Sequence, residues 1–286
     1  MLRELAHHGT IAAVAEALAF SPSAVSQQLS VLEREAGVPL LERTGRRVAL
    51  TPAGRNLVRH TEAVLELLER ADAELAHARR GLAGPLRIGA FPSAVRALVP
   101  AALAELSSRH PELEAMVSEV DPAAVAGALR AGELDVALVH EYDLVPGEPE
   151  DGIALTGPVF AEPLYLAAGS AGTLAGHRES PWIVSPPGTL CHAMVQRVCQ
   201  SAGFSPRVRH RVDDFAAQLA LVAVGQGVAL VPHLGTDRCP PGVVLTRLPL
   251  YRRTRTAFRS GSAAHPAVAA FAAALHAAVP AELRSA

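Results

Sequence analysis

The chain has 286 residues, a formal net charge of −2 and 50% hydrophobic residues, and all 26 of its basic residues are arginine. This length predicts two or three domains, and the aliphatic content is sufficient for a large core, which excludes wholesale disorder. The balanced charge argues against a uniformly basic coat for nucleic acid, but it does not exclude a local basic patch.

The N-terminus and the cysteines indicate a compartment. Residues 1–8 carry an acid early and lack an apolar segment behind a basic start, so they do not look like a signal peptide. There is no run of 18 consecutive apolar residues, which predicts a chain without a membrane span. The three cysteines (Cys191, Cys199 and Cys239), in a chain without an export signal, predict reduced thiols. We therefore expect a soluble, cytoplasmic protein.

The first 80 residues have an almost wholly helical pattern. One helix is predicted over 10–18 with Thr10 as its N-cap, and a second follows Ser21, with Pro22 at its first position. The second helix is predicted to end near Ala36, with a buried stripe formed by Val25, Leu29 and Leu32. Two helices joined by a tight turn form a candidate helix-turn-helix.

The opposite face of the second helix is polar. It carries Ser23, Ser26, Gln27, Ser30 and Arg34. Glutamine offers a donor and an acceptor together, which the major groove can read, and serine can bond bases or phosphates. The alternative interpretation is an ordinary helical hairpin with a solvent face.

An arginine cluster follows and favours the DNA-binding interpretation. Residues 43–60 contain five arginines and no Asp or Glu: Arg43, Arg46, Arg47, Arg55 and Arg59. The segment 45–47 between two apolar runs predicts a β-hairpin tip, and such a wing would lie on the phosphate backbone.

Several runs of this sequence resemble LysR-type transcriptional regulators. The match covers most of residues 8–56, through Thr10–Leu18, Ser21–Leu29, Leu32-Glu33, Gly37–Arg43 and Leu50–Gly54. It extends more weakly through Leu86–Gly89, Gly132–Ala137 and Leu221–Pro232. The sequence begins partway into the first helix of the family, so either the true start lies upstream or this helix is short.

The resemblance implies a set of DNA-binding residues. Base-edge contacts map onto Pro22, Ser23, Ser26 and Gln27, and phosphate contacts map onto Gln28, Arg43, Arg46 and Arg47.

A long helix is predicted from residue 55 to about residue 80. An apolar seam with alternating spacings of four and three predicts a short coiled coil, formed by Leu57, Thr61, Val64, Leu68, Ala71, Leu75 and Ala78. We interpret it as a dimerisation arm rather than a helix lying on its own domain. The family resemblance implies a homo-oligomer, a dimer and then a tetramer of such dimers.

From residue 84, short β-like runs alternate with alanine-rich helical runs, the first of them predicted as a helix from Ala94 to His110, which predicts an α/β fold with parallel strands. The predicted domains are a winged helix-turn-helix (1–54), a linker helix (55–83) and an effector-binding domain (84–286). The resemblance implies a two-lobed, periplasmic-binding-protein-like effector domain, with lobe I at about 84–161 and 257–286 and lobe II at about 162–256. Chain crossings are expected near 160–162 and 253–256.

In such lobes a ligand lies beyond the carboxyl ends of the strands. This geometry selects Ser93 and Ala94 after the first strand, Glu141 and Tyr142 in a loop after the strand ending at Val139, and Gly188 and Thr189 in lobe II. Ser93 and Thr189 would also be good helix caps without any ligand, and Asp213 is expected to cap its helix. The expected partners are double-stranded DNA, a small-molecule effector and a second copy of the chain, with no membrane.

Three other functions have weaker support in the sequence. Peroxide-sensing members of the family use a cysteine pair, but Cys191 and Cys199 are eight residues apart on a predicted helix, about 12 Å along its axis, so buried inert thiols are favoured. A solute-binding receptor would share the two lobes without needing residues 8–80. We find no phosphate-binding loop, nucleophile elbow or zinc motif, and we expect no enzyme, no catalytic residues, no metal and no cofactor.

Overall fold

The computed structural model describes residues 1–44, 47–78, 82–147 and 150–284, and the chain divides into two compact units, 1–71 and 72–286. The first unit contains the helices and the hairpin of the head, and the second contains the α/β lobes. The long helix α4 (Pro52–Ala78) begins in the first unit and ends in the second.

The first unit is a short helical bundle followed by a hairpin. Its elements are α1 (Leu2–His8), α2 (Ile11–Ala17), α3 (Pro22–Ala36), β1 (Leu41–Thr44), β2 (Arg47–Leu50) and the first part of α4. Its core consists of Leu2, Leu5, Val14, Ala15, Val25, Leu29 and Leu40. The predicted caps are confirmed, because the hydroxyls of Thr10 and Ser21 each accept a bond from a backbone N–H of the following helix. Helix α1 has seven residues and buries Leu2 and Leu5.

A carboxylate joins the hairpin to α3. The Glu33 carboxylate accepts the backbone N–H groups of Leu40 and Leu41, both at 2.8 Å. The Thr51 hydroxyl donates to the Pro39 carbonyl and accepts from the Gly54 N–H, which closes the base of the hairpin. The motif Thr51–Gly54 therefore holds the hairpin base against the start of α4.

The second unit is built on one long mixed sheet. The strands of this unit are β3 (Gly84–Ala90), β4 (Leu113–Glu119), β5 (Val136–Tyr142), β6 (Ile153–Leu155), β7 (Phe160–Ala168), β8 (Pro181–Val184), β9 (Arg207–Arg211), β10 (Ala229–Pro232) and β11 (Val244–Arg259). Of these, β8 and β9 pair in parallel as a separate two-stranded sheet. Among the described residues the main sheet has the order β10-β7-β11-β5-β3-β4, with β6 added beside β11. Strands β3, β4 and β5 run parallel, whereas β7 and β11 pair antiparallel along most of their length.

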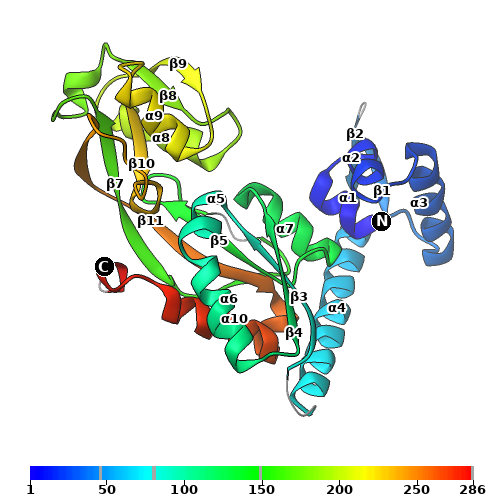
Figure 1. Cartoon of the computed structure of the whole chain (residues 1–286). Helices are drawn as coiled ribbons and strands as arrows, with labels where there is room; N and C mark the ends of the chain where they lie inside the picture. Colours follow the sequence, from blue (N-terminus) through cyan, green and yellow to red (C-terminus); the bar gives the residue numbers. More distant parts are fainter. Residues whose placement is uncertain (45–46, 79–81, 148–149, 285–286) are drawn as a thin grey trace. The chain divides into compact units, whose positions relative to one another are not determined.

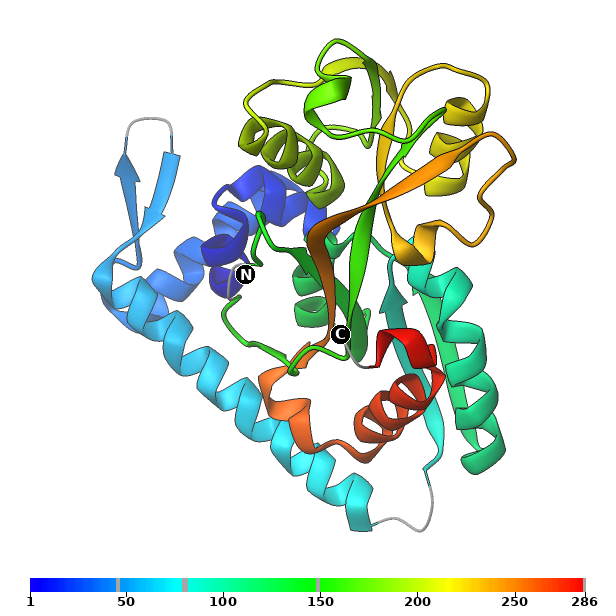
Figure 2. The ribbon, with the colours of Figure 1, turned by 90° about the vertical axis from the view of Figure 1, so that its left-hand side faces the viewer.

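Helices cover both faces of each lobe. They are α5 (Pro92–Ala97), α6 (Val99–Arg109), α7 (Pro122–Ala131), α8 (Leu190–Ser201), α9 (Phe215–Ala223) and α10 (Pro266–Ala278), with short 3-10 turns at 175–177, 233–235, 260–264 and 281–283. In lobe I, α6 and α10 pack on one face and α7 on the other. In lobe II, α8 and α9 belong to two separate cores. Figures 1 and 2 show β7 and β11 running from one lobe into the other, so these strands form the hinge.

Three sequence-based predictions are wrong in detail. The helix predicted from Ala94 to His110 breaks at Leu98, because Pro100 lacks an N–H and crowds the carbonyl of the preceding turn. The strand predicted to end at Val139 continues to Tyr142, because β11 pairs with it over its whole length. Glu141 and Tyr142 therefore lie in a strand and not in a loop.

The third discrepancy concerns the strands of the hinge. The 16-residue strand β11 was expected only as a chain crossing near 253–256, and β6 was not expected. Proline and alternating arginines in β11 hide its strand pattern, and its pairing with β7 shifts register between Arg247 and Tyr251. The predicted crossings at 160–162 and 253–256 lie side by side, since Phe160 pairs with Thr254 and Glu162 with Arg252.

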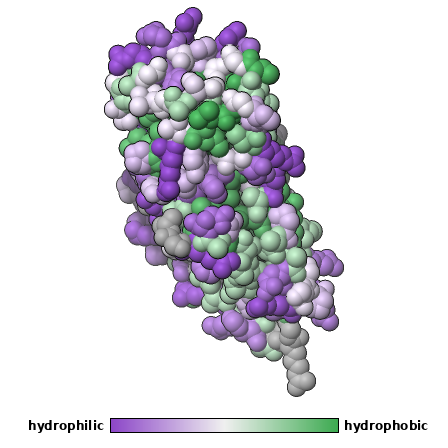
Figure 3. Space-filling model, turned by 60° about the vertical axis from the view of Figure 1, so that its left-hand side comes forward, coloured by the Kyte–Doolittle hydropathy of each residue, from purple (hydrophilic) through white to green (hydrophobic). Residues whose placement is uncertain are grey.

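The surface of the second unit is mixed. On the face drawn in Figure 3, hydrophobic and hydrophilic residues alternate over both lobes, with one small hydrophobic group in the upper part. No helix among the described residues is both long and apolar enough to span a bilayer.

Candidate functional site

Helix α3 presents a polar face to solvent. Val25 and Leu29 are buried, whereas all five candidate DNA-contacting residues of this helix are exposed: Pro22, Ser23, Ser26, Gln27 and Gln28. Within the part of the chain that the structure describes, the amides of Gln27 and Gln28 make no hydrogen bond, which leaves them available to bases. The geometry is that of a recognition helix.

The β1–β2 hairpin, which follows α3 in the chain, carries several of the candidate arginines. Arg43 and Arg47 lie on the paired strands β1 and β2, opposite Val48 and Thr44. Arg46 lies outside the described residues. The other two arginines of the cluster are exposed: Arg55 donates to the Leu50 carbonyl at 2.7 Å, and Arg59 donates to the amide oxygen of Asn56. The DNA contacts of all these residues stay predictions.

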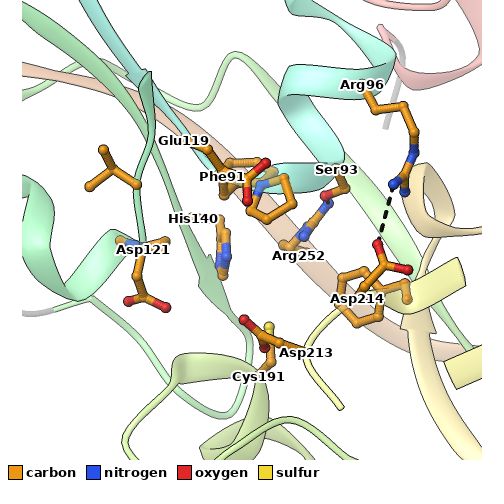
Figure 4. Close-up of a pocket in the computed structure, with 14 residues that line it drawn as sticks. Phe91, Ser93, Arg96, Glu119, Asp121, His140, Cys191, Asp213, Asp214 and Arg252 are labelled. Carbon is orange, nitrogen blue, oxygen red and sulfur yellow. Dashed lines mark hydrogen bonds and ion pairs between the residues drawn. The ribbon is translucent and has the colours of Figure 1, made fainter. Parts of the chain in front are cut away.

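A polar cavity of about 140 Å³ lies between the two lobes (Figure 4). Lobe I contributes the start of α5 and the loop before α7, lobe II contributes the starts of α8 and α9, and the hinge contributes β11. The residues that line it are Phe91, Pro92, Ser93, Arg96, Glu119, Val120, Asp121, Pro122, His140, Cys191, Asp213, Asp214, Phe215 and Arg252.

A buried ion pair places Arg252 in the wall of this cavity. Glu162 and Arg252 are 0% and 1% exposed, and the Arg252 Nε donates to Glu162 Oε1 at 2.7 Å. Glu162 Oε2 accepts the Leu234 N–H at 2.6 Å, and the Arg252 Nη2 donates to the Ser93 hydroxyl at 2.9 Å. The guanidinium also lies 4.7 Å from the ring centroid of Phe91. The pair thus joins both hinge strands to lobe I.

The neighbouring carboxylate decides the charge state of Arg252. Burial alone lowers the pKa of Arg252, but the Glu162 carboxylate acts in the opposite direction, and the pKa stands above its ordinary value. Arg252 is therefore a fixed cation whose charge is already compensated.

His140 stands beside this cation in the cavity wall. Burial, and then the positive charge of Arg252, hold the pKa of His140 well below its ordinary value, so the imidazole is neutral. The edge of the Phe91 ring meets it at 4.7 Å between centroids. Among the described residues, its buried Nδ1 has no hydrogen-bond partner. A bound molecule could supply that partner.

Cys191 lies at the start of α8 and faces the same cavity. Its Sγ is 3.2 Å from the Tyr142 hydroxyl. Burial raises the pKa of the Cys191 thiol, although the bond from Tyr142 acts in the opposite direction. Burial also raises the pKa of Tyr142 well above its ordinary value. Both groups are therefore neutral near pH 7.

The remaining candidate effector residues fall in different places. Ser93 lines the cavity, whereas Ala94 is fully buried behind it. Tyr142 belongs to the core of lobe II. Thr189 caps α8 by accepting the His192 N–H, and neither it nor Gly188 is among the described residues that line the cavity. Their roles in ligand binding stay predictions.

One capping prediction is wrong. Asp214, and not Asp213, caps α9, because its carboxylate accepts the Ala217 N–H at 2.8 Å. Asp213 instead lines the cavity as an exposed carboxylate.

The Glu162–Arg252 ion pair was not predicted from the sequence. Glu162 was available as a signal, because it is the single charged residue in an otherwise apolar strand, and such a residue needs a buried partner. Nothing local pointed to Arg252, which is 90 positions away and stands in an arginine-rich segment.

A second, larger cavity adjoins the first. It has a volume of about 670 Å³ and lies between α7, β5, β6 and β11, with Leu190 from lobe II at one side. Glu141 and Arg255 pair on its wall at 3.0 Å. Pro122 and His140 line both cavities.

An exposed helix after a tight turn, a paired hairpin and a two-lobed unit with an interlobe cavity define a class of protein. This class is the DNA-binding regulator with a ligand-receiving domain. Comparison with known families agrees in both units: the helix-turn-helix model of lysR-family bacterial regulatory proteins matches residues 1–55, and the LysR substrate binding domain model matches residues 79–280. The chain therefore belongs to the LysR family of transcriptional regulators, and the predicted resemblance is confirmed.

Individual relatives extend the comparison. The probable hydrogen peroxide-inducible genes activator of Mycobacterium avium is 32% identical over 228 residues, which are 77% of this chain and 71% of the relative. The structure of a Corynebacterium glutamicum OxyR C206 mutant is 25% identical, with a TM-score of 0.61, covering 97% of this chain and 89% of that one. Full-length CbnR in complex with its target DNA is 25% identical, with a TM-score of 0.56 and 97% of both chains covered.

Proposed function

We propose that this regulator binds double-stranded DNA through α3 and the β1–β2 hairpin, and that a small molecule in the interlobe cavity modulates that binding. The exposed amides and hydroxyls of α3 would read base edges, and the hairpin arginines would neutralise phosphates. A relative of known structure, CbnR, is described in complex with its target DNA, which supports the same partner here.

The observation that carries the effector proposal is the composition of the cavity wall. Ser93 comes from lobe I, Cys191 and Asp213 come from lobe II, and Arg252 comes from the hinge. A molecule that contacts all three parts would favour one angle between the lobes over others, since a ligand shifts a conformational equilibrium by its differential affinity.

The end of α4 moves with lobe I. The His77 ring bonds the Ala264 carbonyl at 2.8 Å, and His265 lies 3.9 Å from Asp72. A change in the angle between the lobes therefore changes the orientation of α4 relative to lobe II. We expect ligand binding to affect DNA binding by this route.

We also propose self-association through α4, first to a dimer and then to a tetramer. The helix is about 40 Å long, and four large apolar side chains on it are more than half exposed: Val64, Leu67, Leu68 and Leu75. Apolar side chains at this spacing stabilise paired helices. We place this regulator in the cytoplasm and assign it no catalytic turnover, since its named relatives are regulators.

The test is a ligand-dependent change in DNA binding by the full-length protein. A site would be selected from random DNA, and compounds found by thermal shift would be titrated into a footprinting assay. Val120→Trp would fill the cavity without removing any side-chain hydrogen bond, and Val224→Trp, at a position 68% exposed, is the matched control. We expect the ligand response to disappear in the first variant and to persist in the second.

A second candidate function is a response to peroxide at Cys191. The relatives named for peroxide induction favour it, and so does the position of Cys191 on the cavity wall. The thiolate would attack one peroxide oxygen, break the O–O bond and become a sulfenic acid, with the other oxygen leaving as hydroxide and taking up a proton to form water.

Two features weigh against this second candidate. Burial raises the pKa of Cys191, which reduces its thiolate at neutral pH. Cys199 is fully buried in the lobe II core on the same helix, about 12 Å away along its axis, so a disulfide between them requires α8 to unfold. A thiol count after peroxide treatment decides the matter: one thiol lost in wild type and none in Cys191→Ser would support it, and an unchanged wild-type count would end it.

A further inference from the structure

The small cavity has an excess of negative charge. Glu119, Asp121 and Asp213 line it as exposed carboxylates, and none of the three has an ion-pair partner among the described residues. One oxygen of Asp121 accepts the Ala123 N–H at 2.8 Å. The cavity wall is therefore electronegative unless its own cations compensate these groups.

Each cation of the cavity already has a carboxylate nearby, although the Arg96 Nε makes no hydrogen bond among the described residues. Arg252 is compensated by the buried Glu162. Arg96 lies 3.4 Å from the Asp214 carboxylate and 3.3 Å from that of Asp237. A carboxylate ligand would have to compete with these pairs and approach three uncompensated acids. Like charges that share a small cavity repel one another, so this arrangement is unfavourable.

His140 supplies an independent sign of a ligand. Its side chain is 6% exposed, its Nδ1 has no partner among the described residues, and Figure 4 shows the ring between Asp121 and Asp213 in that view. A buried polar atom without a partner costs free energy, which a bound donor or acceptor would recover. The site is thus a cavity with an unsatisfied polar group in its wall, and the acidic residues surround it.

The larger cavity beyond His140 has a different character. Most of the residues that line it are apolar, among them Val125, Ala126, Val139, Val145, Pro146, Ile153, Leu155, Leu190 and Ala257. Its main ion pair is internally satisfied, because Glu141 accepts from both Arg255 and the Gly147 N–H. This cavity is suited to an apolar group without charge.

We propose that the effector of this regulator is an amphipathic amine, with its ammonium head in the small cavity among Asp121, Asp213 and His140 and its apolar body in the larger one. This inference rests on the proposed function, since it names the chemistry of the molecule that the interlobe site receives. The ammonium replaces part of its hydration with the carboxylates, and the Nδ1 of His140, in the tautomer whose proton is on Nε2, accepts one of its N–H groups.

Three probes of equal chain length test this proposal: hexylamine, 1-hexanol and hexanoate. Each would be titrated by calorimetry into the full-length protein at pH 7.5. We expect hexylamine to bind at least about tenfold more tightly than hexanoate, with 1-hexanol between them, and the preference to shrink as salt is added.

A charge variant and a matched control locate the effect. Asp213→Asn is expected to weaken hexylamine about threefold or more and to leave 1-hexanol unchanged, because only the ammonium uses the lost charge. Glu105→Gln removes an acid that lines neither cavity, and it should change neither affinity. Equal or tighter binding of hexanoate, an unchanged hexylamine affinity in Asp213→Asn, or no binding of any probe would each overturn the proposal.

Ligand chemistry and ligand-controlled DNA binding can be tested separately. If screened ligands alter the footprint through the cavity but are anions, the amine proposal is wrong and the proposed function stands. If hexylamine binds as expected but no cavity ligand changes the footprint, the ligand chemistry stands and the proposed function is wrong.

Discussion

Removal of the buried carboxylate at Glu162 should strongly destabilise the second unit. Glu162→Ala deletes the acceptor for both Arg252 and the Leu234 N–H, and leaves a guanidinium that is 1% exposed, without a carboxylate partner among the described residues and still bonded to the Ser93 hydroxyl. Breaking a buried ion pair on one side costs about 3–5 kcal/mol.

The double variant separates this explanation from simple loss of packing. In Glu162→Ala with Arg252→Met, the uncompensated charge is gone, so much of the lost stability should return. We expect a coupling of about 2–3 kcal/mol between the two positions, as for residues in one hydrogen-bond network.

Urea unfolding can measure this directly. Trp182 is the only tryptophan of the chain, and it is fully buried in lobe II, so its fluorescence reports the unfolding of the second unit. With a urea slope of about 2–3 kcal/mol/M, the single variants should lower the midpoint by roughly 1–2 M. If the double variant lost the sum of the two single losses, the buried pair would not be a coupled unit and the reasoning would be refuted.

Three further predictions concern other parts of the molecule. Gly54→Ala should destabilise the head by about 1–3 kcal/mol, because a Cβ there would lie 2.2 Å from the Leu40 carbonyl oxygen. Gly127→Ala in α7 should instead stabilise the protein by about 0.5–1 kcal/mol, because an added Cβ meets no neighbouring atom within 4 Å. Thermal melts would compare the two variants. Burial raises the pKa of the Cys199 thiol from 9.0 to about 12. The stability gained from keeping this thiol neutral is therefore complete below pH 9 and is lost as the pH rises from 9 towards 12. In urea melts across this range, wild type should lose stability relative to Cys199→Ala, and a parallel pH dependence of the two proteins would contradict this prediction. Gln27→Ala should relax base preference at one position by about 1–3 kcal/mol without changing the salt slope, and a site selection that returned the same motif for both proteins would exclude this role.

The head could be predicted well because its signals are local. The caps at Thr10 and Ser21 and the proline at position 22 act within one helical turn, and the structure confirms them. The Glu33 carboxylate that holds the hairpin was not predicted, because its partners are backbone groups seven and eight positions away.

The second unit was predictable in its alternation and not in its hinge. Strands such as β3 and β4 carry apolar side chains at alternating positions and lie next to helices in sequence, so their pattern is visible. Strand β11 depends on pairing with β5 and β7, which supplies hydrogen bonds that local sequence does not encode. The same strand brings Arg252 to the cavity wall, so the most consequential side chain of the site was hidden with it.

The cavity could be predicted only in outline. The rule that ligands lie beyond the carboxyl ends of parallel strands selected Ser93 correctly as a lining residue. It also selected Tyr142, which packs in the lobe II core because β5 continues past the expected strand end. Which residues face an interlobe space depends on where the hinge strands end, and that is a long-range property.

The most direct test of the account is a footprint of the full-length protein on its selected DNA site, with and without a cavity ligand, compared between wild type and Val120→Trp. We expect the ligand to change affinity or footprint length in wild type and in the Val224→Trp control, and to have no effect when the cavity is filled. An identical ligand response in Val120→Trp, or no protection of any selected DNA, would contradict the claim that this chain is a DNA-binding regulator controlled through the interlobe cavity.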